Sequence, residues 1–149
     1  MLRPLAVIML LAAVPALAVP PKTAPAAPPA ATGASIHLNP VPGRPAAGYV
    51  SITGGARPDR LVGVSAPGAR IEMHSMTMAG GIMKMAKLAS LDVPAGGKAV
   101  FAPGGNHLMI FGLTGTPASL PITLAFASGA KVTATAIVKT IGAEDHAGH

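Results

Sequence analysis

The stretch KAVFAPGGNHLMIFGLTGTPASLPITLAFASGAKVTATAIVK, residues 98–139, carries the pattern that decides the fold. Four short runs rich in apolar and β-branched residues alternate there with breakers such as Pro103-Gly104-Gly105 and Ser128-Gly129. The runs are Lys98–Ala102, His107–Leu113, Pro121–Ala127 and Lys131–Lys139. None shows a sustained 3.6-residue period, so an amphipathic helix is disfavoured. Many short strands at this spacing predict an all-β sandwich or barrel.

The same texture continues toward the N-terminus as far as Gly33. Further candidate strands are Ser35–Leu38, Gly48–Thr53, Arg60–Ser65, Ala69–His74 and Gly81–Met85. Between the last of these and Lys98, the segment Ala86–Leu91 is expected to hold a turn of helix at most. The sequence contains no internal repeat. We therefore expect one β-domain over residues 33–141.

The first 18 residues resemble an export signal. Arg3 gives a positive start, Leu5–Val14 is a short apolar run, and Ala16-Leu17-Ala18 suits cleavage after Ala18. The alternative, a membrane anchor, would need about 20 apolar residues. We predict a signal peptide at 1–18, a periplasmic location, and no membrane span after signal removal.

Two further segments differ from the domain in composition. Residues 19–32, which include VPPKTAPAAPPAA, are rich in Pro and Ala and favour an extended linker. Residues 142–149, GAEDHAGH, form a small polar tail that carries His146 and His149 and that we predict to be flexible.

Composition excludes several classes of function. The chain has no cysteine, so it can form no disulfide, thiolate nucleophile, His₂Cys copper centre or cysteine-linked lipid anchor. The net charge is +6, but the basic residues are scattered and the chain has only one Tyr and three Phe. Nucleic-acid binding is therefore a poor interpretation.

Methionine and histidine cluster in one part of the chain. Six of the eight methionines lie between positions 73 and 109, together with two of the five histidines. They are Met73, Met76, Met78, Met83, Met85 and Met109, with His74 and His107. Thioether sulfur is soft and neutral and favours Cu(I), and neutral imidazole adds a stronger donor. The alternative is that these methionines fill a core or form an adaptable binding face.

Strand geometry supports part of a metal site. Side chains two apart on a strand share a face, so His107 and Met109 point the same way, as do Met83 and Met85. His74 is expected at the end of its strand. Adjacent strand residues point to opposite faces, which places Ser75 poorly for catalysis with His74. We expect no enzymatic activity.

The spacing of four of these residues resembles a known signature. Ten residues separate His74 from Met85, twenty-one separate Met85 from His107, and one separates His107 from Met109. This spacing is similar to the motif of the PCu(A)C family of periplasmic copper chaperones. Similar segments surround it: Ala46–Tyr49, Asp59–Val64, Val93–Gly97 and Pro103–Met109. The resemblance implies a cupredoxin-like Greek-key β-sandwich with one exposed Cu(I) site, whose ligands are His74, Met85, His107 and Met109. Ser75 and His37 depart from the family pattern but leave these four positions intact.

The resemblance also implies a role. The family carries copper toward the CuA centre of cytochrome c oxidase, so the expected partners are an oxidase CuA subunit or a Sco-type chaperone, and the protein is expected to be a monomer. Sequestration without a delivery partner is an alternative, and a metal-free interaction module is another. We expect Met73 in the core and a structural role for His37. A secondary contact by Met83 and a weaker Cu(II) site at His146 and His149 remain open.

Overall fold

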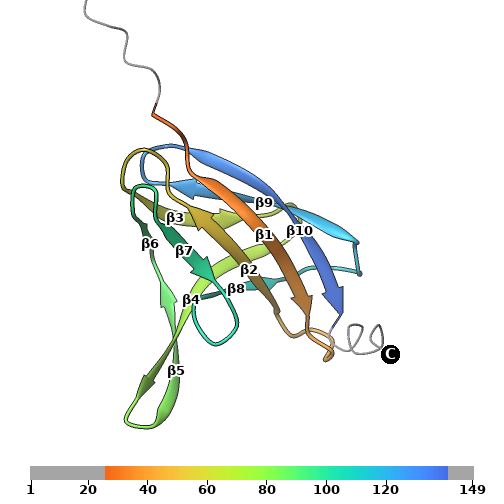
Figure 1. The fold of residues 1–149 in the computed structure, drawn as a ribbon. Helices are drawn as coiled ribbons and strands as arrows, with labels where there is room; N and C mark the ends of the chain where they lie inside the picture. The colour runs from red at the N-terminus through yellow and green to blue at the C-terminus, as the bar shows by residue number, and fades with distance from the viewer. Residues whose placement is uncertain (1–25, 141–149) are drawn as a thin grey trace, which may run out of the picture.

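A computed structural model describes residues 26–140. The predicted signal peptide, the first part of the predicted linker and the tail with His146 and His149 lie outside the described residues. Every regular element within residues 26–140 is a β-strand (Figure 1). The strands are β1 (Ala30–Leu38), β2 (Ala46–Thr53), β3 (Asp59–Ser65), β4 (Arg70–Ala79), β5 (Ile82–Leu88), β6 (Leu91–Val93), β7 (Lys98–Phe101), β8 (His107–Phe111), β9 (Ser119–Phe126) and β10 (Lys131–Thr140). The all-β prediction is confirmed.

Several strand boundaries differ from the sequence-based expectation. The segment Ala86–Leu91, expected to hold a turn of helix at most, holds none: β5 runs to Leu88, and the short strand β6 begins at Leu91. Ala and Lys favour helix in isolation, but hydrogen bonding of β5 to β4 overrides that weak preference. Strand β4 continues to Ala79, well beyond His74. Strand β1 begins at Ala30 and includes the last three residues of the segment assigned to the linker.

The strands form one hydrogen-bonded path that folds back on itself. The order is β5-β4-β8-β2-β1-β10-β9-β3-β6, and β7 pairs with β2. Strands β1 and β10 pair in parallel, which joins the two ends of the described chain. Strands β3 and β4 contact each other although they are not neighbours in this path. The path therefore closes into two layers around a core.

Alternation along the strands defines the core. In β2, every second residue from Ala46 to Ile52 is buried, and in β8 Leu108 and Ile110 are buried while His107 and Met109 are not. Each fully buried Leu or Ile side chain contributes about 1.5–3 kcal/mol. A Cβ on Gly48 would lie 3.0 Å from atoms of both Ile110 and Leu108, so glycine lets β2 approach β8 closely. The core thus determines which side chains of β8 face outward.

The β4–β5 hairpin extends beyond the sandwich (Figure 1). Its turn is Gly80-Gly81, with φ values of +60° and +77° that glycine adopts without strain. The residues from Thr77 to Lys87 are all exposed. Within the described part of the chain, no helix has the length and apolarity needed to cross a bilayer.

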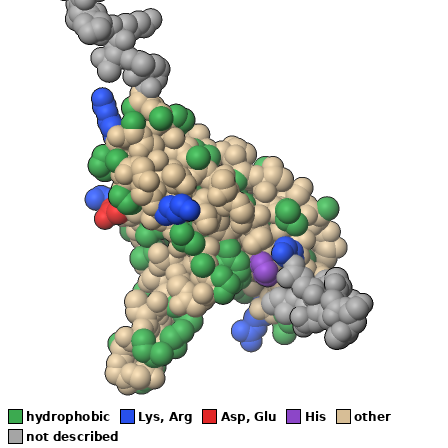
Figure 2. Space-filling view, in the orientation of Figure 1, with side chains coloured by type: hydrophobic (Ala, Val, Ile, Leu, Met, Phe, Trp, Pro, Cys, Tyr) green, Lys and Arg blue, Asp and Glu red, His purple; other side chains and the backbone are tan. Residues whose placement is uncertain are grey.

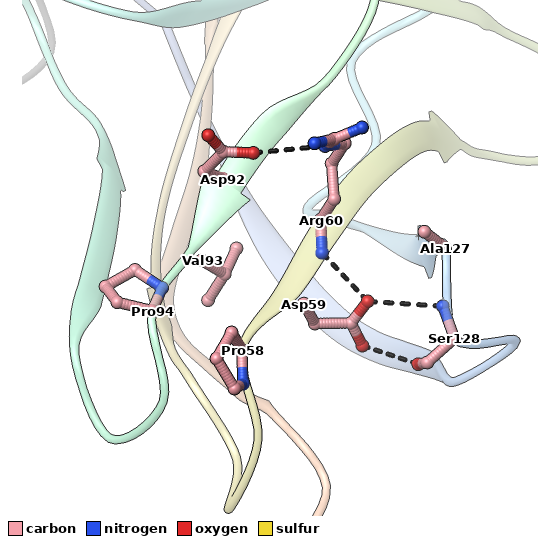
Figure 3. Close-up of a pocket in the computed structure, with 8 residues that line it drawn as sticks. All are labelled: Pro58, Asp59, Arg60, Asp92, Val93, Pro94, Ala127 and Ser128. Carbon is pink, nitrogen blue, oxygen red and sulfur yellow. Dashed lines mark hydrogen bonds and ion pairs between the residues drawn. The ribbon is translucent and has the colours of Figure 1, made fainter.

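A polar network connects β3, β6 and the turn after β9 (Figure 3). Asp59 accepts hydrogen bonds from the backbone N–H groups of Arg60, at 2.8 Å, and Ser128, at 3.2 Å, and from the Ser128 hydroxyl. Arg60 pairs with Asp92 at 3.0 Å. A cavity of about 850 Å³ lies here, but its charged side chains are paired with their neighbours in this way. The Ser128 hydroxyl is the main group that holds the pKa of Asp59 below its ordinary value of 3.8.

The variant Asp59→Asn tests this network. Because the folded-state pKa of Asp59 is depressed, its charge stabilises the fold above the unfolded-state pKa, and that contribution is lost as the pH falls through the folded-state pKa. We expect a lower Tm for the variant at pH 7 and a difference from wild type that shrinks below about pH 4. Thermal unfolding followed by circular dichroism measures this. A difference that stays constant down to pH 2 would contradict it.

Candidate metal centre

The candidate centre lies on the outer face of β4 and β8, on the side away from the core. In the antiparallel register His74 is opposite His107, and Met73 is opposite Leu108. Directly opposite residues point to the same face of a sheet. Met73 and Leu108 are buried, at 5% and 1% exposure, so the two histidines point outward. The prediction that Met73 packs in the core is confirmed.

The same register brings the methionines to this face. Met109 is opposite Glu72 of β4 and Ala47 of β2, and Met85 of β5 is opposite Met76 of β4. Met76 lies two residues after His74 on β4, so both point to the same face, and Met85 of β5 points to that face because it is directly opposite Met76. The four residues of the predicted motif therefore lie on one face.

The two histidine rings stack on each other. Their centroids are 5.9 Å apart and their planes meet at 22°. This close parallel arrangement follows from their direct pairing across β4 and β8. Two imidazoles that are 33 positions apart in the sequence thus become neighbours.

A carboxylate sets the tautomer of His74. Its Nε2 lies 3.1 Å from Glu72 Oε2, and both side chains are largely buried, at 14% and 16% exposure. The hydrogen bond from His74, followed by the one from Lys87 and by the charges of Lys87 and Arg70, lowers the pKa of Glu72 to about 2. An ionised carboxylate only accepts, so His74 Nε2 carries the proton.

The other nitrogen of His74 is left without a partner. His74 Nδ1 is buried and finds no hydrogen-bond partner among residues 26–140. A buried lone pair without a donor costs roughly 1–3 kcal/mol. A metal ion would satisfy this nitrogen, because a histidine ligand typically donates its second N–H to a carboxylate or carbonyl.

His107 has the opposite tautomer. Its Nδ1 lies 3.1 Å from the carbonyl oxygen of Gly105, so Nδ1 donates and Nε2 keeps its lone pair in the neutral ring. That Nε2 lies 3.3 Å from the sulfur of Met85. Nitrogen and sulfur ligands on one tetrahedral ion, with bonds of about 2.0 and 2.3 Å, lie roughly 3.5 Å apart. The two donor atoms are therefore spaced as they would be around a shared ion.

An open cavity of about 380 Å³ lies next to the two histidines. Met85, His107 and Met109 line it, together with Tyr49 and Met76. His74 is not part of the lining and lies beside it, stacked on His107. Met85 is 52% exposed, since it comes from the projecting hairpin. The arrangement combines two partly buried nitrogen donors with a solvent-accessible sulfur.

Met76 is the methionine of this cavity that the motif does not include. It lies two residues after His74 and shares its outer face. Strand alternation places Met76 on this face once β4 continues past His74, where the sequence pattern predicted the strand to end. Met83 shares the face of Met85 as expected, but it pairs with Met78 farther out on the hairpin.

Two other predicted placements have clear local partners. His37 Nε2 lies 3.3 Å from the Ser35 hydroxyl, and the ring meets Tyr49 edge-on with centroids 5.2 Å apart. Ser75 points to the face opposite His74, where its hydroxyl donates to the carbonyl of Ala86 at 3.5 Å. Among the described residues, no three His, Cys, Asp or Glu side chains are placed to hold a metal ion.

These features define a class of protein: a small β-sandwich with a cluster of histidine and methionine side chains on one outer face. Residues 30–138 match the family described as "Putative lipoprotein LpqE-like". The chain therefore belongs to the LpqE-like family. No curated protein sequence matches it.

Solved structures that share the fold include three PCuAC domains. The copper-bound PCuAC domain from PmoF2 is 23% identical, with a TM-score of 0.59 over 74% of this chain and 91% of that domain. The apo PmoF2 domain is 22% identical with a TM-score of 0.59, covering 76% of this chain and 90% of that one. The apo PCuAC domain from PmoF1 is 19% identical with a TM-score of 0.56, covering 77% and 92%. The expected PCu(A)C-type, cupredoxin-like fold is confirmed.

The opposite tautomers of the two histidines can be tested without metal. Long-range ¹H–¹⁵N correlation spectra at about pH 8, above the ordinary histidine pKa of about 6.5, report which ring nitrogen is protonated. We expect Nδ1 to be the bare nitrogen of His74 and Nε2 to be that of His107. In Glu72→Gln the preference of His74 should weaken, while His107 should not change. Identical tautomers in the wild-type protein would contradict this assignment.

Proposed function

We propose that this protein binds one Cu(I) ion as cargo through His74, Met85, His107 and Met109. The observation that carries the proposal is the 3.3 Å approach of His107 Nε2 to the Met85 sulfur; the ring of His74, whose Nδ1 has no partner among the described residues, stacks on that of His107. Met109 lines the same cavity and adds the second sulfur. Two imidazoles and two thioethers form a donor set without a thiolate.

The donor set favours Cu(I) over harder ions. Thioethers are soft and neutral, whereas Mg²⁺ and Ca²⁺ prefer carboxylate and carbonyl oxygens. The Glu72 carboxylate holds His74 by its Nε2–H, which orients the ring and makes Nδ1 a better donor. Neither thioether requires deprotonation, so binding competes with protons only at the two imidazoles.

Release is favoured by the same arrangement. Met85 is exposed and carried by a hairpin that extends beyond the sandwich, so an incoming donor can displace its sulfur first. The histidines are held by Glu72 and by the Gly105 carbonyl and would leave later. Ligand exchange of this kind passes the ion on without a change of oxidation state. This is a non-enzymatic carrier mechanism.

The location and the recipient are further parts of the proposal. The LpqE-like family is named for lipoproteins, which are exported, and the first 18 residues resemble a signal. We place the protein in the periplasm and propose delivery toward the CuA centre of an oxidase, directly or with a Sco-type chaperone. Sequestration is the alternative function. Transfer of bound Cu(I) to an isolated apo CuA domain separates the two.

The proposed ligands are tested by Cu(I) competition with a chromophoric chelator. We expect Met85→Ala, Met109→Ala and His107→Ala each to weaken Cu(I) binding by roughly 10–100-fold, since even outer partners of a metal ligand contribute that much. Ser75→Ala is the matched control, because Ser75 is adjacent to His74 but faces the other way. Wild-type affinity in all three methionine and histidine variants would end the proposal.

A further inference from the structure

The outer face with the candidate site continues along the projecting hairpin. Two cross-strand methionine pairs follow each other there: Met76 opposite Met85, then Met78 opposite Met83. Side chains two apart on a strand share a face, so all four thioethers lie on the face that holds His74. The second pair is nearer the Gly80-Gly81 turn.

These outer methionines do not serve the core. Met78 and Met83 are 66% and 50% exposed, in contrast to Met73 at 5%. Figure 2 shows hydrophobic side chains on the projecting hairpin, toward its tip. Side chains that remain this exposed gain little from burial, so packing does not account for Met78 and Met83.

The opposite face of the hairpin has a different composition. It carries Ser75, Thr77 and Lys84, together with Ala79, Ile82 and Ala86. Apart from Met73, which is buried in the core opposite Leu88, no methionine of the described hairpin lies on that face. The other four thioethers of the hairpin therefore all lie on the face that continues to His107.

We infer that Met76, Met78 and Met83 form a thioether track that carries Cu(I) between the tip of the hairpin and the site at Met85 and His107. This inference rests on the proposed Cu(I) function. The Cβ atoms of directly opposite residues lie about 4.5–5.5 Å apart, close enough for both sulfurs to reach one ion. The two pairs are separated by two residues, or about 6.8 Å along the strand.

The track works by ligand exchange alone. A Cu(I) ion held by Met78 and Met83 gains the sulfurs of Met76 and Met85 as it loses the first pair, and then gains the nitrogen of His107. Thioethers are neutral, so no proton is moved, and the ion stays Cu(I) throughout. Two weak sulfur donors bind less tightly than the mixed site, which gives the movement a direction inward during loading.

The experiment measures the rate of loading from a small donor. The full chain is mixed with the Cu(I)–bicinchoninate complex, and the loss of its colour is followed by stopped flow. We expect Met78→Leu/Met83→Leu to load roughly tenfold more slowly, a size comparable to that of other outer partners of metal sites. Leucine keeps the volume and hydrophobicity and removes only the sulfur. The final affinity for one Cu(I) should stay within twofold of wild type.

A relocation variant controls for the number of methionines. Thr77→Met, added to Met78→Leu/Met83→Leu, places a thioether one residue away on the opposite face. It should not restore the loading rate, whereas returning Met78 and Met83 should. A small donor has no protein surface to dock, so a slower rate cannot arise from a lost protein contact.

The outcomes separate the track from the site. Absence of Cu(I) binding to the wild-type chain would defeat the proposed function itself. Normal affinity with an unchanged loading rate in Met78→Leu/Met83→Leu would overturn only the track, and so would recovery in the Thr77→Met background. Shifts of the ¹³C-methyl signals of Met78 and Met83 as Cu(I) is added beyond one equivalent would support it, and unmoved signals would count against it.

Discussion

The pairing of β4 with β8 is the constraint on which the rest of the site depends. It places His74 opposite His107 and, one step along, Met73 opposite Leu108 in the core. A slip of one residue would turn His74 inward and expose Met73, because side chains alternate between faces. Burial of Met73, Leu108 and Ile110 opposes that slip. Ordinary apolar packing thus positions the imidazoles.

The candidate ligands differ in how firmly they are held, and this difference suits a carrier. His74 and His107 belong to the sandwich, and each is oriented through its second nitrogen, by Glu72 and by the Gly105 carbonyl respectively. The hydrogen bond from His74, followed by the contacts of Lys87 and Arg70, keeps Glu72 ionised. Met85 comes instead from an exposed hairpin with a Gly-Gly turn. Two firmly oriented histidine ligands and one accessible methionine sulfur would allow the protein both to bind Cu(I) and to release it.

Much of this could be predicted from the sequence, and the omissions have physical causes. Gly and Pro breakers between β-branched runs indicated the strands, and two-residue alternation placed His107 and Met109 on one face. Met76 was missed because β4 was expected to end at His74, although pairing with β5 carries it to Ala79. Strand β6 is three residues long, too short for a periodic signal. The contact of Glu72 with His74 depends on side-chain geometry that spacing alone does not give.

X-ray absorption of the Cu(I)-loaded protein tests the central claim most directly, because it identifies the atoms bonded to the ion. The account predicts two nitrogen neighbours at about 2.0 Å and two sulfur neighbours at about 2.3 Å. Loss of one sulfur neighbour in Met109→Ala would assign that ligand. A shell composed only of nitrogen and oxygen would contradict the assignment of the two thioethers and, with it, the copper-carrier account.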